Sequence, residues 1–240
     1  MTDASTAGHP QGEPHSSSVS SSTNTLRAGV LGANDGIVSV AALLLGMAGT
    51  GASDSMIVTA GLASTVAGAV SMALGEYVSV SSQRDTERMF VEKERRELAE
   101  DPNGELEEIA EILTGYGIHE DTAHKAATEI QDGDPLPVHL QLELGIDEGD
   151  LTNPVAAAVS SAIAFTLGAL LPMLAAFLAP SSAQAITITI VTLIALAITG
   201  GLSAKLSKTS VPRAIMRLVI GGALGLAVTY GIGRAFGVAG

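Results

Sequence analysis

The distribution of acidic residues constrains this chain more than any other feature of its sequence. Residues 151–240 contain no Asp or Glu and consist mainly of Ala, Leu, Ile, Val and Gly. Three apolar runs in this part, at about 155–178, 185–204 and 212–236, each approach or exceed the ~20 residues that a spanning helix needs. Two earlier runs, at about 26–48 and 56–80, have the same character. The sequence therefore predicts an all-α, polytopic membrane protein with five transmembrane helices.

Most of the acidic residues lie between the second and third apolar runs. Of the 25 Asp and Glu in the chain, 20 fall between residues 84 and 150, where only 6 Lys or Arg accompany them. An acidic block of this size argues against nucleic acid as a partner and favours cations, with a merely solvated helical surface as the alternative. The chain has no Cys, which excludes thiolate metal sites, disulfides and cysteine catalysis.

The composition along the chain divides it into four expected parts. Residues 1–24, rich in Ser, Thr, Gly and Pro, are predicted to be a disordered tail. Residues 25–82 are expected to hold transmembrane helices 1 and 2, residues 83–150 an acidic helical cytoplasmic metal-binding domain, and residues 151–240 transmembrane helices 3 to 5. Within the insert, 105–113 and 119–131 are predicted amphipathic helices, and 135–144 a third. Asn153 before Pro154 is a helix start signal.

Basic residues predict the orientation of these helices. The link between the last two apolar runs holds Lys205, Lys208 and Arg213, with Arg217 just beyond, and is expected to be cytoplasmic. This choice puts the N-terminus and the insert in the cytoplasm and the C-terminus outside, although Arg234 near the outer end does not fit. The lack of a targeting segment fits a prokaryotic cell membrane, with the membrane of a eukaryotic organelle as the alternative. Five helices rich in Gly and Ala pack closely but hardly enclose a path, so we expect a homodimer with the path at its two-fold interface.

A few polar residues within the first two apolar runs are candidates for a transport path. Asp35, next to Asn34, lies inside the first run, where a charged Asp costs ~2.5–3.5 kcal/mol. Ser64, Met72 and Glu76 recur at four-residue multiples and share one face of the second helix. Carboxylate and thioether ligands suit a borderline divalent ion. The alternatives are an interfacial Asp that caps a helix and a Met that only packs.

Pairs of glutamates in the insert are candidates for metal capture. Glu94 with Glu97, and Glu108 with Glu111, are spaced i, i+3, so each pair presents two carboxylates from adjacent turns of one helix face. Glu143 and His139, one helical turn apart, could complete the set of metal ligands. Glu-rich amphipathic helices are also commonly just solvated surfaces, and that alternative stays open.

Three of these segments together resemble the vacuolar iron transporter family. They are Asn34-Asp35-Gly36, the stretch 67–72 that ends at Met72, and Glu143-Leu144-Gly145 after a Glu-rich insert, and the match runs from about Leu26 to the C-terminus. The resemblance implies a dimer of five-helix protomers that exports Fe²⁺, and often Mn²⁺, in exchange for protons, with Zn²⁺ or Co²⁺ as further candidates. It assigns Asp35 and Met72 to the translocation path. The insert ligands that it implies are Glu94, Glu97, Glu108, Glu111 and Glu143.

Two departures from the family pattern bear on mechanism. Plant-like members carry a Glu where this chain has Ser64 and small residues where it has Glu76. The proton-coupling role would then fall to Asp35 or Glu76. Met residues near the last insert helix are replaced by His139 and Leu140, so metal preference is expected to differ.

The function expected from these features is export of Fe²⁺ or Mn²⁺ from the cytosol by proton antiport, with the acidic insert capturing the metal. A metal-gated channel and a non-transporting metal sensor or scaffold are the alternatives. No cofactor beyond the transported metal is expected. An enzyme is not expected, because no nucleophile–base pair or phosphate-binding Gly loop is found.

Overall fold

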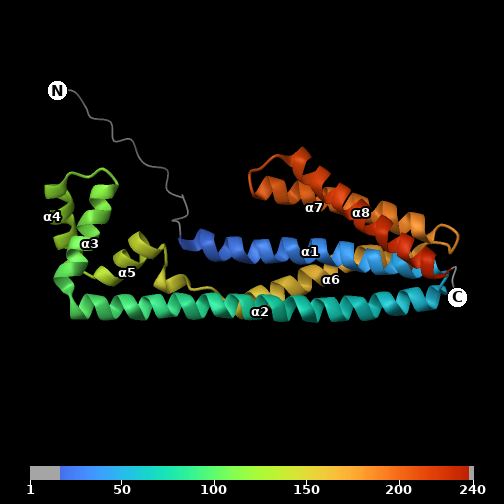
Figure 1. Ribbon diagram of the computed structural model, residues 1–240, viewed down its shortest axis with the longest axis horizontal. Helices are drawn as coiled ribbons and strands as arrows, with labels where there is room; N and C mark the ends of the chain where they lie inside the picture. The colour runs from blue at the N-terminus through green and yellow to red at the C-terminus, as the bar shows by residue number, and fades with distance from the viewer. Residues whose placement is uncertain (1–16, 238–240) are drawn as a thin grey trace, which may run out of the picture. The chain divides into compact units, whose positions relative to one another are not determined.

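The computed structural model describes residues 17–237, with the side chains of residues 28–149 and 151–237, and its regular elements are all helices (Figure 1). The described chain forms two compact units. The membrane unit is made of Asn24–Ser81 together with Asn153–Gly240, and the insert unit is centred on Ser82–Thr152. The helical class that the sequence predicts is confirmed.

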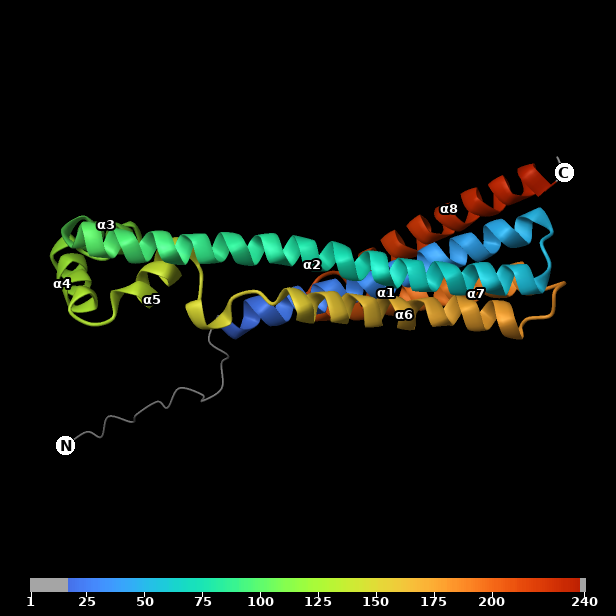
Figure 2. The same cartoon turned by 90° about the horizontal axis from the view of Figure 1, so that it is seen from below.

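Five helices of the membrane unit are long and apolar enough to cross a bilayer. They are α1 (Ser17–Thr50), the first part of α2 (Asp54–Glu100), α6 (Pro154–Leu178), α7 (Gln184–Leu206) and α8 (Val211–Gly237). Their mean hydropathy over 18 residues is 1.7 to 2.2. Helices α1, α2 and α6 run side by side in two perpendicular views (Figures 1 and 2). The predicted number and positions of the spans are confirmed, and the protein is an integral multi-pass membrane protein.

The start of α1 differs from the predicted boundary of the N-terminal tail. The tail was expected to cover residues 1–24, of which 1–16 lie outside the described residues, but α1 begins at Ser17. The segment from Ser17 to Ala28 contains neither Gly nor Pro. Because no helix breaker separates these residues from the apolar run, the helix extends beyond the apolar residues in the N-terminal direction.

Side chains from all five spans meet in one apolar core. Leu44 of α1, Ile57 of α2, Phe165 of α6, Ile188 of α7 and Leu226 of α8 are all buried in it. Helix α6 starts as the sequence predicts, with the Asn153 side-chain oxygen accepting hydrogen bonds from the backbone N–H groups of Val155 and Ala156 at 3.1 Å.

Glycines let the helix backbones of the membrane unit approach one another directly. A Cβ atom on Gly36 of α1 would collide with the backbone carbonyl of Phe165 on α6, and one on Gly168 of α6 would collide with the backbone of Ala33. Gly233 of α8 lies in the same way against the backbone of Gly46. Small residues at crossings are the usual way in which membrane helices gain close packing.

The insert unit packs short helices against the second part of α2. Helices α3 (Pro102–Gly115) and α4 (Glu120–Gln131) match the two predicted amphipathic helices, and their core contains Ile109, Ala110 and Ala127. The third predicted helix, 135–144, consists of α5 (Pro135–His139) followed by a π-helical turn, Leu140–Leu144. A short 3-10 turn, Glu148–Asp150, completes the unit.

A hydrogen-bonded clasp joins the two ends of the insert unit. Glu87, near the point where α2 enters the unit, accepts hydrogen bonds at 3.0 Å from both the backbone N–H and the hydroxyl of Thr152, 65 residues later. Arg95 also donates to Glu148 at 2.8 Å. Because Glu87 and Arg95 both lie on α2, these contacts tie the last residues of the insert back to its first helix.

Candidate metal centre

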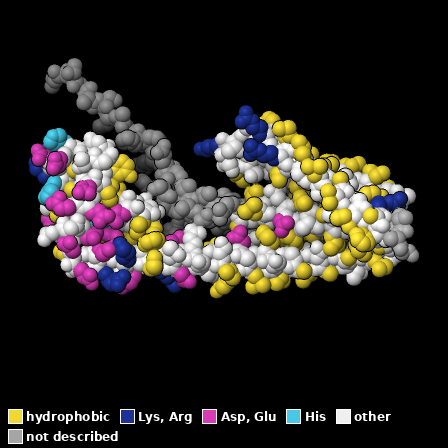
Figure 3. All heavy atoms as spheres, viewed as in Figure 1, with side chains coloured by type: hydrophobic (Ala, Val, Ile, Leu, Met, Phe, Trp, Pro, Cys, Tyr) yellow, Lys and Arg dark blue, Asp and Glu magenta, His cyan; other side chains and the backbone are white. Residues whose placement is uncertain are grey.

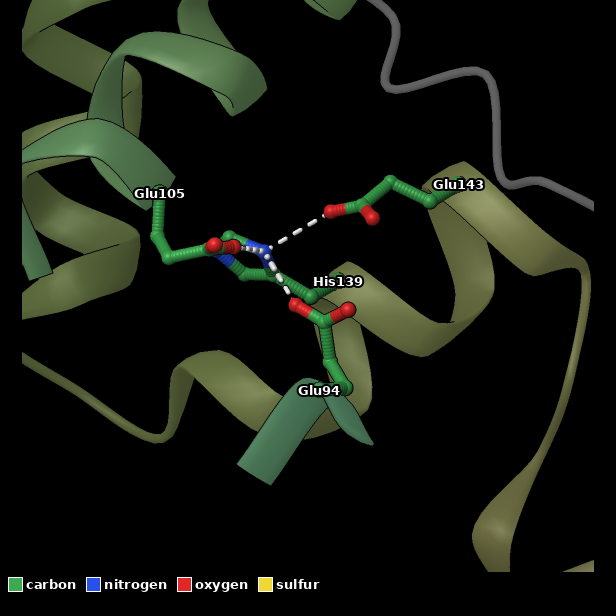
Figure 4. A group of neighbouring side chains, drawn as sticks. All are labelled: Glu94, Glu105, His139 and Glu143. Atoms are coloured by element: carbon green, nitrogen blue, oxygen red, sulfur yellow. Dashed lines mark hydrogen bonds and ion pairs between the residues drawn. The ribbon is translucent and has the colours of Figure 1, made fainter. Parts of the chain in front are cut away.

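The first two acidic side chains of the centre come from helices joined by a sharp turn. Glu94 lies on α2 and is 3% exposed, and Glu105 lies in the first part of α3 and is 8% exposed. Between them Asp101 caps α3 by accepting a hydrogen bond from the Gly104 N–H at 3.0 Å, and Pro102 takes the first helical position. This cap begins α3 directly after α2 ends, which directs Glu105 toward Glu94 (Figure 4).

The remaining two side chains come from α5 and the π-helical turn. His139, the last residue of α5, is fully buried, and Glu143 follows it by four residues. Leu140 is buried next to His139, and its carbonyl accepts a hydrogen bond from the Ile146 N–H at 2.9 Å. The turn ends at Gly145, whose φ of 65° lies in the left-handed region that glycine adopts without strain. Single π-turns are frequent at functional sites.

One nitrogen atom stands among three carboxylates in this cluster (Figure 4). His139 Nδ1 lies 2.8 Å from Glu143 Oε1, 3.0 Å from Glu94 Oε1 and 3.4 Å from Glu105 Oε2. The hydrogen bond of the imidazole goes to Glu143. Glu94 Oε1 and Glu105 Oε2 are buried without a hydrogen-bond partner among the described residues. A neutral imidazole has only one N–H group, so two buried carboxylate oxygens lack a donor.

Burial makes these carboxylates reluctant to ionise. Desolvation, with repulsion from neighbouring carboxylates, raises the pKa of Glu105 to about 7. Desolvation and the charges of Glu108 and Glu105 raise the pKa of Glu143 to about 7 as well. The pKa of Glu94 is also raised, by desolvation first and then by Glu143. A bound cation would counter all three of these effects, because it stabilises the ionised forms.

The four ligand atoms fit one divalent ion. They all lie within 4.8 Å of one another. Ion–ligand distances of about 2.0–2.2 Å place neighbouring ligand atoms about 3 Å apart and opposite ones about 4.4 Å apart. Three carboxylate oxygens with one imidazole nitrogen suit Mn²⁺, Fe²⁺ or Zn²⁺ better than Mg²⁺ or Ca²⁺, which take oxygen ligands alone. Among the described residues this is the one group of at least three His, Cys, Asp or Glu side chains arranged in this way.

The structure brings together only some of the predicted insert ligands. Glu94 and Glu143 lie in the cluster with His139, which the sequence suggested as a further ligand. Glu97, Glu108 and Glu111 lie outside it. Glu97 forms an ion pair with Lys93, and Glu108 and Glu111 are exposed. Their roles as metal ligands stay predictions, and the nearest support for Glu97 and Glu108 is their electrostatic effect on Glu143.

Sequence reasoning missed Glu105, although a signal for it exists. Glu105 precedes the fully buried Ile109 by four residues, so it lies on the apolar face of α3. Glu94 likewise follows the buried Val91 by three residues. The distinguishing signal was therefore a carboxylate on the apolar face of an amphipathic helix, rather than a pair of carboxylates at i, i+3.

The candidate path residues lie on two helices of the membrane unit. Asp35 is exposed on the surface of the unit, and the neighbouring Asn34 is half-buried, with a side-chain oxygen that finds no hydrogen-bond partner within the described residues. On α2, Ser64, Met72 and Glu76 are half-buried, and Met72 packs against the apolar core. The packing of Met72 agrees with its alternative interpretation as a core residue. The role of all five in transport stays a prediction.

Comparison with known proteins covers both units. A family model described as the VIT family matches residues 26–234. The chain is 41% identical over 223 residues to a protein of Acanthamoeba castellanii named "Vacuolar iron transporter", covering 92% of this chain and 82% of the other. It is 35% identical over 216 residues to "Vacuolar iron transporter homolog 1" of Oryza sativa subsp. japonica, covering 90% and 75%. It is 33% identical over 215 residues to "Vacuolar iron transporter homolog 2.1" of Arabidopsis thaliana, covering 89% and 82%.

Proposed function

The chain belongs to the VIT family, and on this premise we propose that it transports divalent iron across its membrane, with Mn²⁺ as a second substrate. The observation that carries this proposal is the buried cluster of Glu94, Glu105, His139 and Glu143 in the insert unit. Such a cluster is unfavourable without a cation, because two of its buried oxygens have no donor in the part of the chain that the structure describes. The insert therefore captures metal on the side of the membrane from which it is transported.

In this proposal the path through the membrane uses Asp35, Met72 and Glu76, assisted by Asn34 and Ser64. An ionisable side chain in a spanning helix needs a partner or a wet cavity, and Asp35 is exposed on a single protomer. A second copy of the chain facing Asp35 would supply that environment. We therefore propose a homodimer with the path at its interface.

The proposed direction of transport is out of the cytosol, in exchange for protons. Moving a dication against an inside-negative potential costs about 4.6 kcal/mol per 100 mV, twice the figure for one charge. Inward proton flow can offset that cost. Protonation of Asp35 or Glu76 would release the metal on the far side and reset the carrier.

The basic turn between α7 and α8 supports the proposed orientation. Lys205, Lys208 and Arg213 are exposed there, and the positive-inside rule places such a turn in the cytoplasm. The N-terminus and the insert then also lie in the cytoplasm and the C-terminus lies outside. The membrane proposed for this chain is a prokaryotic cell membrane, whereas the relatives compared above carry the word vacuolar in their names.

A metal-gated channel, or a membrane metal sensor or scaffold without transport, is the second candidate. The same metal cluster in the insert unit favours it, since a captured ion could regulate the membrane unit instead of passing through it. A carrier and a channel differ in whether a proton gradient drives the flux.

The decisive test is Fe²⁺ and Mn²⁺ uptake into proteoliposomes with an imposed pH gradient. Wild type should take up metal in response to the gradient, and Asp35→Asn should abolish this uptake. Asp54→Asn is the matched control, because Asp54 is an exposed acid at the start of α2 that hydrogen-bonds to Ser181 at 2.7 Å. Metal flux that does not depend on the pH gradient would contradict the proposed exchange of metal for protons. No flux of either ion, with metal binding by the insert intact, would favour the sensor or scaffold.

A further inference from the structure

The turn between α7 and α8 carries a group of basic side chains without acidic neighbours in this part of the chain. Lys205, Lys208, Arg213 and Arg217 are all exposed, and none of the ion pairs formed among the described residues involves them. Residues 151–240 contain no Asp or Glu that could neutralise them. Figure 3 shows Lys and Arg side chains gathered over this turn. The turn therefore presents a concentrated positive charge.

The geometry of the turn favours an anion. Helix α7 ends at Leu206 and α8 begins at Val211, so the N-terminal, partly positive end of a 27-residue helix lies at the turn. Lys208 closes α7 with a φ of 51°, a left-handed conformation that glycine usually supplies. The chain thus keeps a charged side chain at a position where backbone geometry alone would favour glycine.

An apolar groove opens directly beside this basic turn. It has a volume of about 330 Å³ and lies between α1, α6 and α7. Its lining includes Val30, Ala33, Ser160, Thr199, Leu202 and Leu206. Leu206, the last residue of α7, directly follows Lys205, so the groove begins where the basic group begins.

We propose that this basic turn and groove bind an anionic phospholipid from the cytoplasmic leaflet. The phosphate lies between Lys208, Arg213 and the start of α8, and one acyl chain lies in the groove. The position of the turn, between two membrane-spanning helices, puts its charges at the level of lipid headgroups. Charge and apolar surface are adjacent here, as in a phospholipid. An acidic protein surface would match the charge but leave the groove unfilled.

Native mass spectrometry of the full-length protein tests the proposal. The protein in detergent is titrated with phosphatidylglycerol and, separately, with phosphatidylcholine of the same acyl chains. The wild type should retain phosphatidylglycerol preferentially. Each basic residue near a membrane surface contributes about fivefold to the affinity for anionic lipid, so Lys208→Gln with Arg213→Gln should weaken binding about 25-fold. Arg234→Gln, at the other end of the same helix, is the matched control and should have no effect.

Filling the groove tests the acyl chain separately from the phosphate. Ser160→Leu should weaken retention of phosphatidylglycerol, and Thr199→Leu provides a second filling variant if the first folds poorly. Lys208→Arg with Arg213→Lys keeps the charge and should retain the lipid. Equal retention of both lipids by the wild type, or an equal loss in Arg234→Gln, would overturn the proposal. So would cross-links from Lys208 to acidic residues of 84–150 that the lipid does not displace, because they would identify the acidic insert as the occupant.

Discussion

The two units of this protein accommodate acidic side chains in opposite ways. The insert unit buries three carboxylates around one imidazole, and most of its other described acids are exposed, as the gathered Asp and Glu side chains in Figure 3 show. The membrane unit contains few acids, each separate from the others in sequence, and holds its helices together by backbone contacts at glycines. The stability of the insert unit therefore depends on how the charges of its buried carboxylates are compensated. The stability of the membrane unit depends on glycines, which have no side chain, at the points where its helices cross.

The comparison predicts that a single methyl group can damage the membrane unit. Gly36→Ala places a Cβ against the backbone carbonyl of Phe165 and should destabilise the protein by about 1–3 kcal/mol, as overpacking of a rigid contact does. Gly221→Ala is the matched control, since no atom of the described residues outside its own helix turn lies within 4 Å of the added Cβ. Alanine should even stabilise that helix by about 0.5–1 kcal/mol. Thermal unfolding in detergent measures both, and equal midpoints would contradict the glycine-crossing account.

In the insert unit, removing one buried charge should damage metal binding rather than folding. Glu94→Gln should weaken Mn²⁺ binding by about 10- to 100-fold, the range known even for outer-shell groups of metal sites. Glu129→Gln, at an exposed acid of α4 that is not among the candidate ligands, is the control and should bind like wild type. Calorimetric titration of the full-length protein with Mn²⁺ measures the difference. An equal loss in both variants would mean that the acidic surface, not the buried cluster, binds the metal.

The raised pKa values predict a pH dependence that the metal should remove. The pKa values of Glu105 and Glu143 are about 7 in the folded insert, against 4.5 for an unperturbed Glu. The folded state therefore binds more protons than the unfolded state between pH 4.5 and 7. The metal-free insert should lose stability as pH rises through this window, and no more above it.

Hydrogen exchange of the α3 and α4 amides, corrected for its intrinsic pH dependence, measures how the stability of the insert unit changes with pH. Saturating Mn²⁺ should remove this pH dependence, because the ion replaces the protons at the same carboxylate oxygens. A metal-free insert that becomes more protected between pH 5 and 7 would show that its carboxylates are already compensated in some other way.

The smallest predicted effect compares one helix cap in each unit. Asp101→Ala removes the acceptor for the Gly104 N–H in the insert, and Asn153→Ala removes the cap at the start of α6. Each should cost about 1 kcal/mol in local stability. Only Asp101→Ala should also weaken Mn²⁺ binding, because its cap orients the helix that carries Glu105. Loss of Mn²⁺ binding in Asn153→Ala would show that the two units are coupled through the start of α6.

The membrane unit was the more predictable of the two from sequence. Long apolar runs specify spanning helices whatever their partners, and the Asn153-Pro154 signal located the start of α6 because capping is local chemistry. The predicted start of α1 was less accurate. The polar residues after Ser17 include no Gly or Pro, so the helix continues through them. The sequence could not show which glycine of α1 lies at the crossing with α6. Gly32, Gly36, Gly46 and Gly49 all lie in similar surroundings in the sequence.

The metal cluster was only partly predictable. Spacing placed Glu94, Glu143 and His139 among the candidates, but it could not show that Glu105 faces them while Glu108 and Glu111 face water. That choice depends on the angle at which α3 leaves α2, which the turn at Asp101 sets. The π-helical turn at Leu140–Leu144 also has no sequence signature, yet it directs Glu143 toward His139.

The clasp between Glu87 and Thr152 has a consequence for how this architecture can vary. Two hydrogen bonds hold the first and last residues of the insert side by side, although 65 residues separate them. A segment whose ends already meet can be shortened, exchanged or removed without requiring a long connection in its place. The insert therefore has the properties of an interchangeable module, and a chain spliced from residue 87 to residue 152 would need to bridge only the length of the Glu87 side chain and its hydrogen bond to Thr152.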